Sequence, residues 1–274
     1  EDVSTHRRHA YRFGEVPNKW ALEKCGSPVL ALTCAVDVHG DNLAVAVWGW
    51  TRERRALLVD YWRFEGATDH LDTPETWGRL RRLIEEKVYE ADDGKRYRVA
   101  MTLIDSGFLP DTVHAFTADY AHSVYAIRGR QLPPKTSKVP EFSQFTNPMG
   151  NTSFNITVDL YKDRWSSALR RSWDGVGQLG AGMLSAPIDV SDKQLKELTV
   201  ETKREKIDSA TGQRVGFVWH RPSGADNELW DLLVYGSAAF DMLAWDVCRN
   251  QLGLEAVNWQ AFYAMCETQR IYYS

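Results

Sequence analysis

Three aspartates stand within or at the end of apolar segments, where carboxylates are rare. Asp37 interrupts the apolar run 29–38, Asp105 closes the run 99–105, and Asp231 lies inside a third run. A buried carboxylate is costly unless it is paired, protonated or bound to a metal. One shared divalent-cation site would satisfy all three residues at once. The alternative is that each aspartate forms its own salt bridge or helix cap.

The neighbouring acids indicate which helical face would look into such a site. Glu228 precedes Asp231 by three residues and shares its face, whereas Asp241 points elsewhere, toward solvent or a neighbouring element. Carboxylates suit Mg²⁺ or Mn²⁺, which prefer oxygen ligands and retain several waters. Two such ions about 4 Å apart can activate a water and stabilise the leaving oxygen in phosphodiester hydrolysis. The residue types therefore favour a two-metal hydrolytic centre.

The composition is that of a globular protein with no global affinity for polyanions. The 274 residues are 43% hydrophobic and 26% charged, with a formal net charge of −4, so any polyanion site must be local or created by bound metal. The four cysteines form no CxxC pair; Cys34 and Cys248 read as core residues, which fits a reduced, cytoplasmic compartment. There is no signal peptide and no apolar stretch as long as a membrane span. The chain starts at Glu1 rather than Met, which is typical of a fragment.

The order of the predicted elements indicates a mixed α/β sheet flanked by helices. Residues 1–28 are predicted to form an arm or linker, and residues 29–274 a single domain. Strands are expected at 29–38, 43–50, 56–64, 98–105 and 124–127, with a hairpin at 198–206 and 214–220; helices are expected from Thr73 to about 92–94 and at 110–121, 159–173, 225–248 and 255–267. The first three strands form an antiparallel meander, and the later ones run parallel. This is the ribonuclease-H-like order with a β-hairpin insertion. Residues 129–152 are expected to form a long loop.

Several basic clusters are available to contact phosphates. Arg128, Arg130, Lys135 and Lys138 follow a strand into the long loop, and Lys203, Arg204 and Lys206 lie on the predicted hairpin. Arg79, Arg81 and Arg82 are interpreted as a solvated helix face. Most of the eleven tryptophans lie in apolar runs and are expected in the core rather than in a stacking surface. His39 and His220 are possible general bases, but a lone histidine is usually structural.

Three segments resemble, in order, the motifs of the nuclease domain of the lambda-like phage terminase large subunit. They are residues 32–39 (LTCAVDVH), 103–108 (LIDSGF) and 226–235 (DNELWDLLVY). Residues 125–129 and 198–201 also look like family segments, so the likeness spans roughly residues 29–245. The Asn-Glu-x-x-Asp helix is the most specific part of the resemblance.

This resemblance implies a ribonuclease-H-like, two-metal endonuclease that uses Mg²⁺ or Mn²⁺ and cuts concatemeric double-stranded phage DNA at the start and end of head filling. It assigns metal ligation to Asp37, Asp105 and Asp231, with Glu228 in a supporting position. His39 stands where a Gln is expected, which would change the metal environment. The implied partners are an ATPase motor domain, the small terminase subunit and the portal, in the host cytoplasm and without a membrane. No GxxxxGK[ST] loop occurs, so the motor itself is expected to be absent.

Two other functions remain open from the sequence. A ribonuclease-H-like resolvase or transposase core would use the same carboxylates but would prefer branched over linear duplex DNA. A catalytically silent docking module for the portal or the small terminase subunit would bind neither Mg²⁺ nor Mn²⁺.

Overall fold

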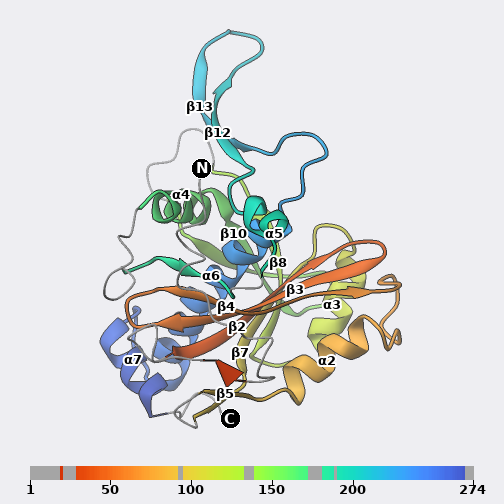
Figure 1. Ribbon diagram of the computed structural model, residues 1–274, viewed down its shortest axis with the longest axis vertical. Coiled ribbons are helices and arrows are strands. Elements are labelled where there is room, and N and C mark those ends of the chain that lie inside the picture. Colours follow the sequence, from red (N-terminus) through yellow and green to blue (C-terminus); the bar gives the residue numbers. More distant parts are fainter. Residues whose placement is uncertain are drawn as a thin grey trace.

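A mixed eight-stranded sheet forms the centre of the molecule (Figure 1). The computed structural model describes residues 19–20, 29–91, 95–132, 139–171, 181–187 and 190–268. The strands of this sheet are β2 (Val29–Val38), β3 (Asn42–Thr51), β4 (Ala56–Glu65), β7 (Val99–Asp105), β8 (Val124–Arg130), β9 (Phe142–Thr146), β10 (Thr152–Thr157) and β11 (Leu184–Ser185). Their spatial order is β11-β4-β3-β2-β7-β8-β10-β9.

The strand directions confirm the predicted ribonuclease-H-like arrangement. β2, β3 and β4 form the antiparallel meander, β7 lies parallel to β2 on its other side, and β8 lies parallel to β7. β2 is therefore a central strand, and nine of its ten residues are buried. A continuous apolar run is expected for such a strand because both of its faces are covered. Two small sheets complete the strands: β1 (Lys19–Trp20) with β5 (Tyr89–Ala91) and β6 (Arg96–Tyr97), and β12 (Thr202–Ile207) with β13 (Arg214–His220).

Helices cover both faces of the sheet. They are α2 (Trp77–Glu85), α3 (Pro110–Ala118), α4 (Val158–Leu169), α5 (Asp192–Glu197), α6 (Glu228–Asp246) and α7 (Trp259–Glu267), and a π-helical turn, Val247–Gln251, continues α6. On β4, Arg63 contacts Glu228 of α6, whereas the next residue, Phe64, lies under Arg79 of α2. Successive strand residues point to opposite faces, so α6 and α2 lie on opposite sides of the sheet.

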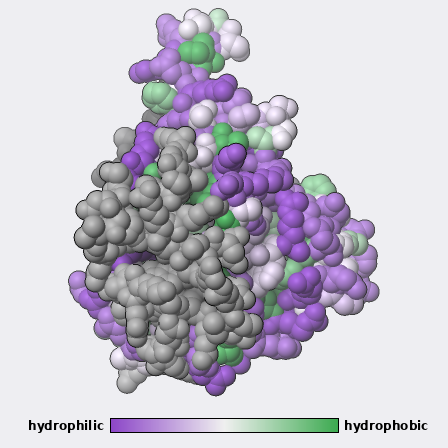
Figure 2. Space-filling view, viewed as in Figure 1, coloured by the Kyte–Doolittle hydropathy of each residue, from purple (hydrophilic) through white to green (hydrophobic). Residues whose placement is uncertain are grey.

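The β12–β13 hairpin projects from the body of the molecule (Figure 1). All six residues of β12 are exposed, as expected for a two-stranded ribbon that projects into solvent. Its surface mixes hydrophilic and hydrophobic side chains (Figure 2), including Ile207 and Phe217, which are about half exposed. The predicted hairpin is thus confirmed.

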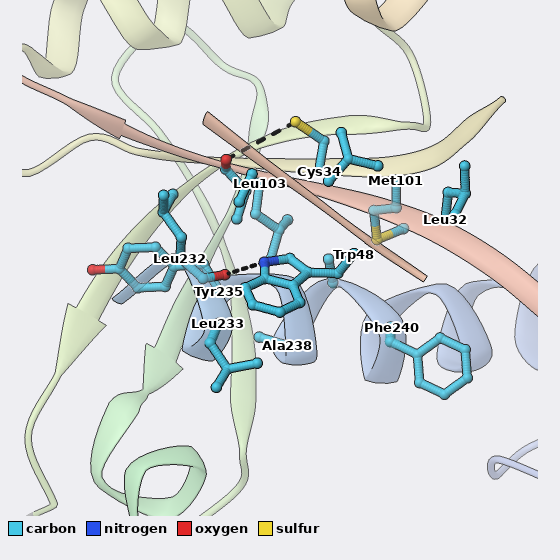
Figure 3. Close-up of a cluster of buried hydrophobic side chains, with 14 of the residues drawn as sticks. Leu32, Cys34, Trp48, Met101, Leu103, Leu232, Leu233, Tyr235, Ala238 and Phe240 are labelled. Atoms are coloured by element: carbon cyan, nitrogen blue, oxygen red, sulfur yellow. Dashed lines mark hydrogen bonds between the residues drawn. The ribbon is translucent and has the colours of Figure 1, made fainter. Parts of the chain in front are cut away.

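Helix α6 approaches the sheet unusually closely at Gly236. A Cβ atom at this position would lie 2.3 Å from Cδ1 of Trp48. The indole Nε1 of Trp48 donates a 3.0 Å hydrogen bond to the carbonyl of Leu232 (Figure 3). Thr33 Oγ1 donates to the carbonyl of Gly236. These bonds from β3 and β2 fix the position of α6 on the sheet, and with it the position of the acids in its first turn.

Some predicted boundaries were wrong for local reasons. Thr73 does not cap α2: its hydroxyl donates to the carbonyl of His70, and residues 74–76 form a turn before the helix begins at Trp77. The helix also ends earlier than predicted, at Glu85, because β5 forms soon afterwards. The expected long loop at 129–152 is interrupted by β9, which pairs with β10.

The predicted core is confirmed where the structure describes it. Cys34 and Cys248 are buried free thiols, and Trp48, Trp50 and Trp230 are buried. Among the described helices, none has the length and apolar character needed to cross a membrane. The division into an arm, residues 1–28, and a domain, residues 29–274, stays a prediction.

Candidate metal centre

Three distant segments bring their aspartates to one edge of the sheet. Asp37 is the second-last residue of β2, and Asp105 is the last residue of the parallel neighbour β7. Asp231 lies in the first turn of α6, which packs across β2. Parallel strands end at the same edge of a sheet, and ligands collect there in open α/β folds. The convergence expected from the sequence is therefore present.

Asp37 forms a compact cluster with His39 and Glu228. The Nε2 atom of His39 lies 2.7 Å from Oε2 of Glu228 and 3.5 Å from Oδ2 of Asp37. One potential ligand atom from each residue falls within 4.8 Å of the others. His39 thus belongs to the cluster itself, and Glu228 is closer to Asp37 than a distant supporting role would require. Nη2 of Arg63 lies 3.5 Å from the other carboxylate oxygen of Glu228, Oε1.

The electrostatics of Asp37 are those of a carboxylate without sufficient positive charge. Burial raises its pKa to about 7, and the nearby carboxylates of Asp105, Asp231 and Glu228 act in the same direction, against the effect of His39. The hydrogen bond to Glu228 raises the pKa of His39 above its ordinary value. No lysine or arginine within the described residues forms a salt bridge with Asp37. A bound cation would lower this electrostatic cost.

Within the part of the chain that the structure describes, Asp105 is held in place by hydrogen bonds and forms no ion pair. The hydroxyl of Tyr235 donates a 2.9 Å bond to Oδ2, and the backbone N–H of Gly107 donates a 3.0 Å bond to Oδ1. Burial nevertheless raises the pKa of the Asp105 carboxyl. Burial also raises the pKa of Tyr235, and the charges of Asp105, Asp231 and Asp37 act in the same direction, so this hydroxyl remains a proton donor.

Among the described residues, a lysine pairs with only one of the three aspartates, Asp231. Lys162 Nζ lies 3.0 Å from Oδ1 of Asp231 and 2.8 Å from Oε2 of Glu201. The amide of Asn227 donates to Oδ2 of Asp231 and to Oε1 of Glu201, closing the network. Burial raises the pKa of Asp231, although Lys162 opposes this effect. Arg221, directly after β13, donates to Asn227 Oδ1. Both ends of the hairpin, at Glu201 and Arg221, are thereby tied to the immediate partners of Asp231.

The donor set fits a hard divalent cation. Asp37, His39 and Glu228 offer ligand atoms within 4.8 Å of one another, and the carboxylates of Asp105 and Asp231 lie near enough to raise the pKa of Asp37. Mg²⁺ and Mn²⁺ accept such ligands and complete their coordination with water. By contrast, Asp241, which the sequence placed on another face of the helix, is neutralised by Arg54 and Arg164 and is structural.

The predicted phosphate-contacting residues are distributed over two places. Arg128 and Arg130 end β8, whose Ile127 pairs with Asp105, so they lie next to the carboxylate edge and are exposed. Lys203, Arg204 and Lys206 are exposed on β12, and Lys203 is paired with Asp163 of α4 at 2.6 Å. Lys135 and Lys138 lie outside the described residues.

Sequence reasoning missed the residues that hold the aspartates. Tyr235 and Asn227 could have been found, because each is four residues from Asp231 on the same helical face. Lys162, Glu201 and Arg63 carried no such local signal, since they come from other elements.

Comparison with known proteins places the chain in a family. A family model described as the terminase large subunit gpA endonuclease domain matches residues 1–252. Among solved structures, the chain is similar to the nuclease domain of the large terminase g2p from bacteriophage SPP1 with bound Mn, at 11% identity and a TM-score of 0.37, over 77% of this chain and 86% of that one. No curated protein matches the sequence. The family match extends over far more than half of the chain, and the chain belongs to the family of terminase large subunit gpA endonuclease domains.

Proposed function

We propose that this domain hydrolyses phosphodiester bonds of double-stranded DNA with two divalent cations, Mg²⁺ or Mn²⁺. The observation that supports this most directly is the meeting of Asp37, Asp105 and Asp231 at one sheet edge, where Asp37 has no lysine or arginine partner among the described residues and only His39 lies beside it, at 3.5 Å. In this proposal Asp37, Asp105 and Asp231 would hold the cations. When bound, the metals would supply an activated water and stabilise the leaving oxygen.

The remaining residues of the site orient these ligands. Tyr235 and the N–H of Gly107 hold the two oxygens of Asp105, and Lys162 and Asn227 hold those of Asp231. His39 connects Asp37 to Glu228 and stands where it can support a ligand or join the metal itself. Groups that orient ligands are expected to matter for activity, because a metal site depends on its supporting hydrogen bonds.

The substrate contacts in this proposal are the basic residues at the same edge and on the hairpin. Arg128 and Arg130 would hold phosphates close to the metals, with Lys135 and Lys138 following in sequence. Lys203, Arg204 and Lys206 would contact the duplex farther out. Contacts of this kind position DNA without reading its sequence.

The biological role that follows is the cutting of concatemeric viral DNA during genome packaging, in the host cytoplasm at the procapsid. The ATPase domain, the small terminase subunit and the portal would be the protein partners. Membership in the terminase family favours this interpretation over a resolvase or transposase core. The docking-module alternative differs in a measurable way, because it predicts no metal binding.

A pair of matched variants tests the proposal. Asp37→Asn should abolish both Mn²⁺ binding by calorimetry and cleavage of supercoiled plasmid. Asp226→Asn is the control, because Asp226 is only five residues from Asp231 but is half-exposed and paired with Lys193; it should keep both activities. Plasmid cleavage by Asp37→Asn at the wild-type rate would contradict the proposal. A wild-type protein that binds its packaging partners but neither Mn²⁺ nor Mg²⁺ would establish the docking module instead.

A further inference from the structure

A polar pocket of about 810 Å³ lies beside α2, on the face of the sheet opposite to α6. Its walls come from β4, from α2 and from the segment that follows α2. Its lining includes the aromatic residues Trp62 and Phe64 and the basic residues Arg79, Arg82, Lys87 and Arg96. The pocket shares no residue with the carboxylate cluster described above.

Its arginines lack the acidic partners that neighbouring cations have. On the same helix, Arg81 pairs with Asp119 at 2.9 Å, and Lys87 pairs with Asp60 at 3.1 Å. Within the described part of the chain, Arg79, Arg82 and Arg96 form no salt bridge. From the sequence, all three arginines of α2 are interpreted as one solvated face. In the structure Arg81 is paired with Asp119, whereas Arg79 and Arg82 form no salt bridge with a described residue.

Four cationic side chains line this pocket against two carboxylates, Glu86 and Glu90, so the excess charge of the lining is positive. Arg79 and Arg82 are three residues apart on one helix, a spacing at which like charges repel. A third unpaired arginine, Arg96, faces the same pocket in a protein whose net charge is −4. Guanidinium groups match the geometry of phosphate oxygens, which can accept two parallel hydrogen bonds from one arginine.

The aromatic residues of the pocket orient the cations instead of offering a stacking surface. The guanidinium of Arg79 lies 4.3 Å from the centre of the Phe64 ring, and Lys87 Nζ lies 4.5 Å from that of Trp62. Phe64 is only 4% exposed, so it has no open face for a nucleobase. Base stacking needs free aromatic faces. The pocket therefore suits a phosphate backbone better than unpaired bases.

The Phe64 end of the pocket lies at the same edge of the sheet as the carboxylate cluster. The register pairs Asp37 with Ala44 and Ala44 with Arg63, and it pairs Val38 with Leu43 and Leu43 with Phe64. Phe64 therefore lies in the row of Val38, one residue beyond the row of Asp37. It is two strand spacings away from β2, a lateral distance of about 10 Å. It points to the opposite face. A duplex that crosses this edge can reach both places.

We propose that the pocket binds the backbone phosphates of duplex DNA beside the cleaved bond, with Arg79 and Arg82 as the main contacts and Arg96 in support. The inference rests on the proposed function for the identity of its ligand. It adds a second contact surface, on the α2 face, to the basic residues near the metal centre and on the hairpin.

Equilibrium binding in the absence of metal tests this surface separately from catalysis. The affinity of a fluorescent 30-base-pair duplex would be measured in EDTA at several salt concentrations for the wild type and for the double variant Arg79→Gln/Arg82→Gln. Each lost phosphate contact lowers the slope of log affinity against log salt by about 0.9. The double variant should therefore show a slope smaller by about 2. The ratio of its affinity to that of the wild type should then change roughly tenfold between about 50 and about 200 mM salt.

Arg249→Gln is the matched control. Arg249 is also exposed and also lies over an aromatic ring, 5.5 Å from the centre of Trp245, but it is at the far end of α6. Its slope and affinity should equal those of the wild type. Melting temperatures of all variants would verify folding, and none should change appreciably because these side chains are exposed.

The outcomes separate the two proposals. An unchanged slope and affinity in the double variant would overturn the pocket assignment, as would a wild type with no measurable affinity for duplex. If the double variant loses binding to labelled polyglutamate but retains its affinity for duplex, the DNA assignment of the pocket is overturned in favour of an acidic protein segment. If the wild type binds duplex, with the smaller slope in the double variant, but cuts no plasmid with Mn²⁺, the proposed hydrolysis fails and the pocket assignment stands.

Discussion

Lys162 and Asp231 form an ion pair in which the lysine is shared with a second carboxylate. Nζ of Lys162 is 3.0 Å from Asp231 Oδ1 and 2.8 Å from Glu201 Oε2, and the lysine side chain is 10% exposed. The pair joins α4 to the first turn of α6, and Glu201 is the residue before β12. One ammonium group therefore supports a proposed metal ligand and the base of the projecting hairpin at the same time.

Removing this ammonium should be costly because two carboxylates would lose their partner. Lys162→Met is expected to lower the free energy of unfolding by about 3 kcal/mol, the lower end of the range for breaking a buried ion pair. Urea unfolding at neutral pH measures it. Adding Glu201→Gln should recover part of the loss, because the second variant removes one of the two unpaired charges.

A surface pair of the same length provides the comparison. Lys193 and Asp226 are 2.9 Å apart, but the lysine side chain is 78% exposed. Lys193→Met should leave stability unchanged, because exposed pairs contribute little. Equal losses in the two lysine variants would show that burial is not the source of the effect.

The metal-free protein should become less stable as the pH rises from about 4 to about 7. Asp37 has a pKa of about 7 in the folded protein, above its ordinary value of 3.8, so the folded state holds a proton that the unfolded state releases in this range. His39 acts in the same direction, because its raised pKa gives stability that is lost as the pH rises through that pKa.

Thermal unfolding in EDTA, with Asp37→Asn as the comparison, isolates the part due to Asp37. The variant should melt above the wild type at about pH 8 and close to it at about pH 4, since Asn carries no charge at either pH. Saturating Mn²⁺ should raise the melting temperature of the wild type only, by the equivalent of about 2.7 kcal/mol at 100 times the dissociation constant. If the metal-free wild type melted at a higher temperature than Asp37→Asn at about pH 8, the charge of Asp37 would not be destabilising and the prediction would be wrong.

Tyr235→Phe should impair cleavage with little effect on folding. The substitution removes the hydroxyl that orients Asp105 and keeps the ring. Supporting groups of metal sites typically contribute 10- to 100-fold, so single-turnover cleavage should slow by about that factor and should recover partly at high Mn²⁺ concentration. Tyr125→Phe serves as the control, because Tyr125 is also buried and its hydroxyl has no hydrogen bond within the described residues. Similar rates for both variants would remove Tyr235 from the site.

Two glycine substitutions should change the stability of the protein in opposite directions. Gly236→Ala places a methyl group 2.3 Å from Trp48, and such overpacking should cost about 1–3 kcal/mol and weaken Mn²⁺ binding, because α6 carries Asp231. Gly78→Ala, within α2, meets nothing closer than 3.4 Å and should stabilise the protein by up to about 1 kcal/mol through helix propensity. Chemical unfolding and calorimetric Mn²⁺ titration measure both. A stabilising Gly236→Ala would mean that α6 can move away from the sheet without loss.

The local sequence pattern was sufficient to predict the positions of the three aspartates. Asp37 is the second-last residue of one apolar run and Asp105 ends another, and such runs become central strands because burial on both faces requires apolar side chains at every position. The strand order then placed the two residues side by side. Boundaries were less predictable, as Thr73 shows, because a hydroxyl that could cap a helix instead bonds within the preceding turn.

The partners of the aspartates followed only from the packed chain. Lys162 is 69 residues from Asp231, and nothing in the local pattern distinguishes it from other lysines. Arg79, Arg81 and Arg82 look equivalent in sequence, yet Asp119 from α3's end neutralises only Arg81. Apolar periodicity is a property of neighbouring residues, whereas the pairing of a charge depends on which distant element arrives beside it, and that is set by how the helices pack on the sheet.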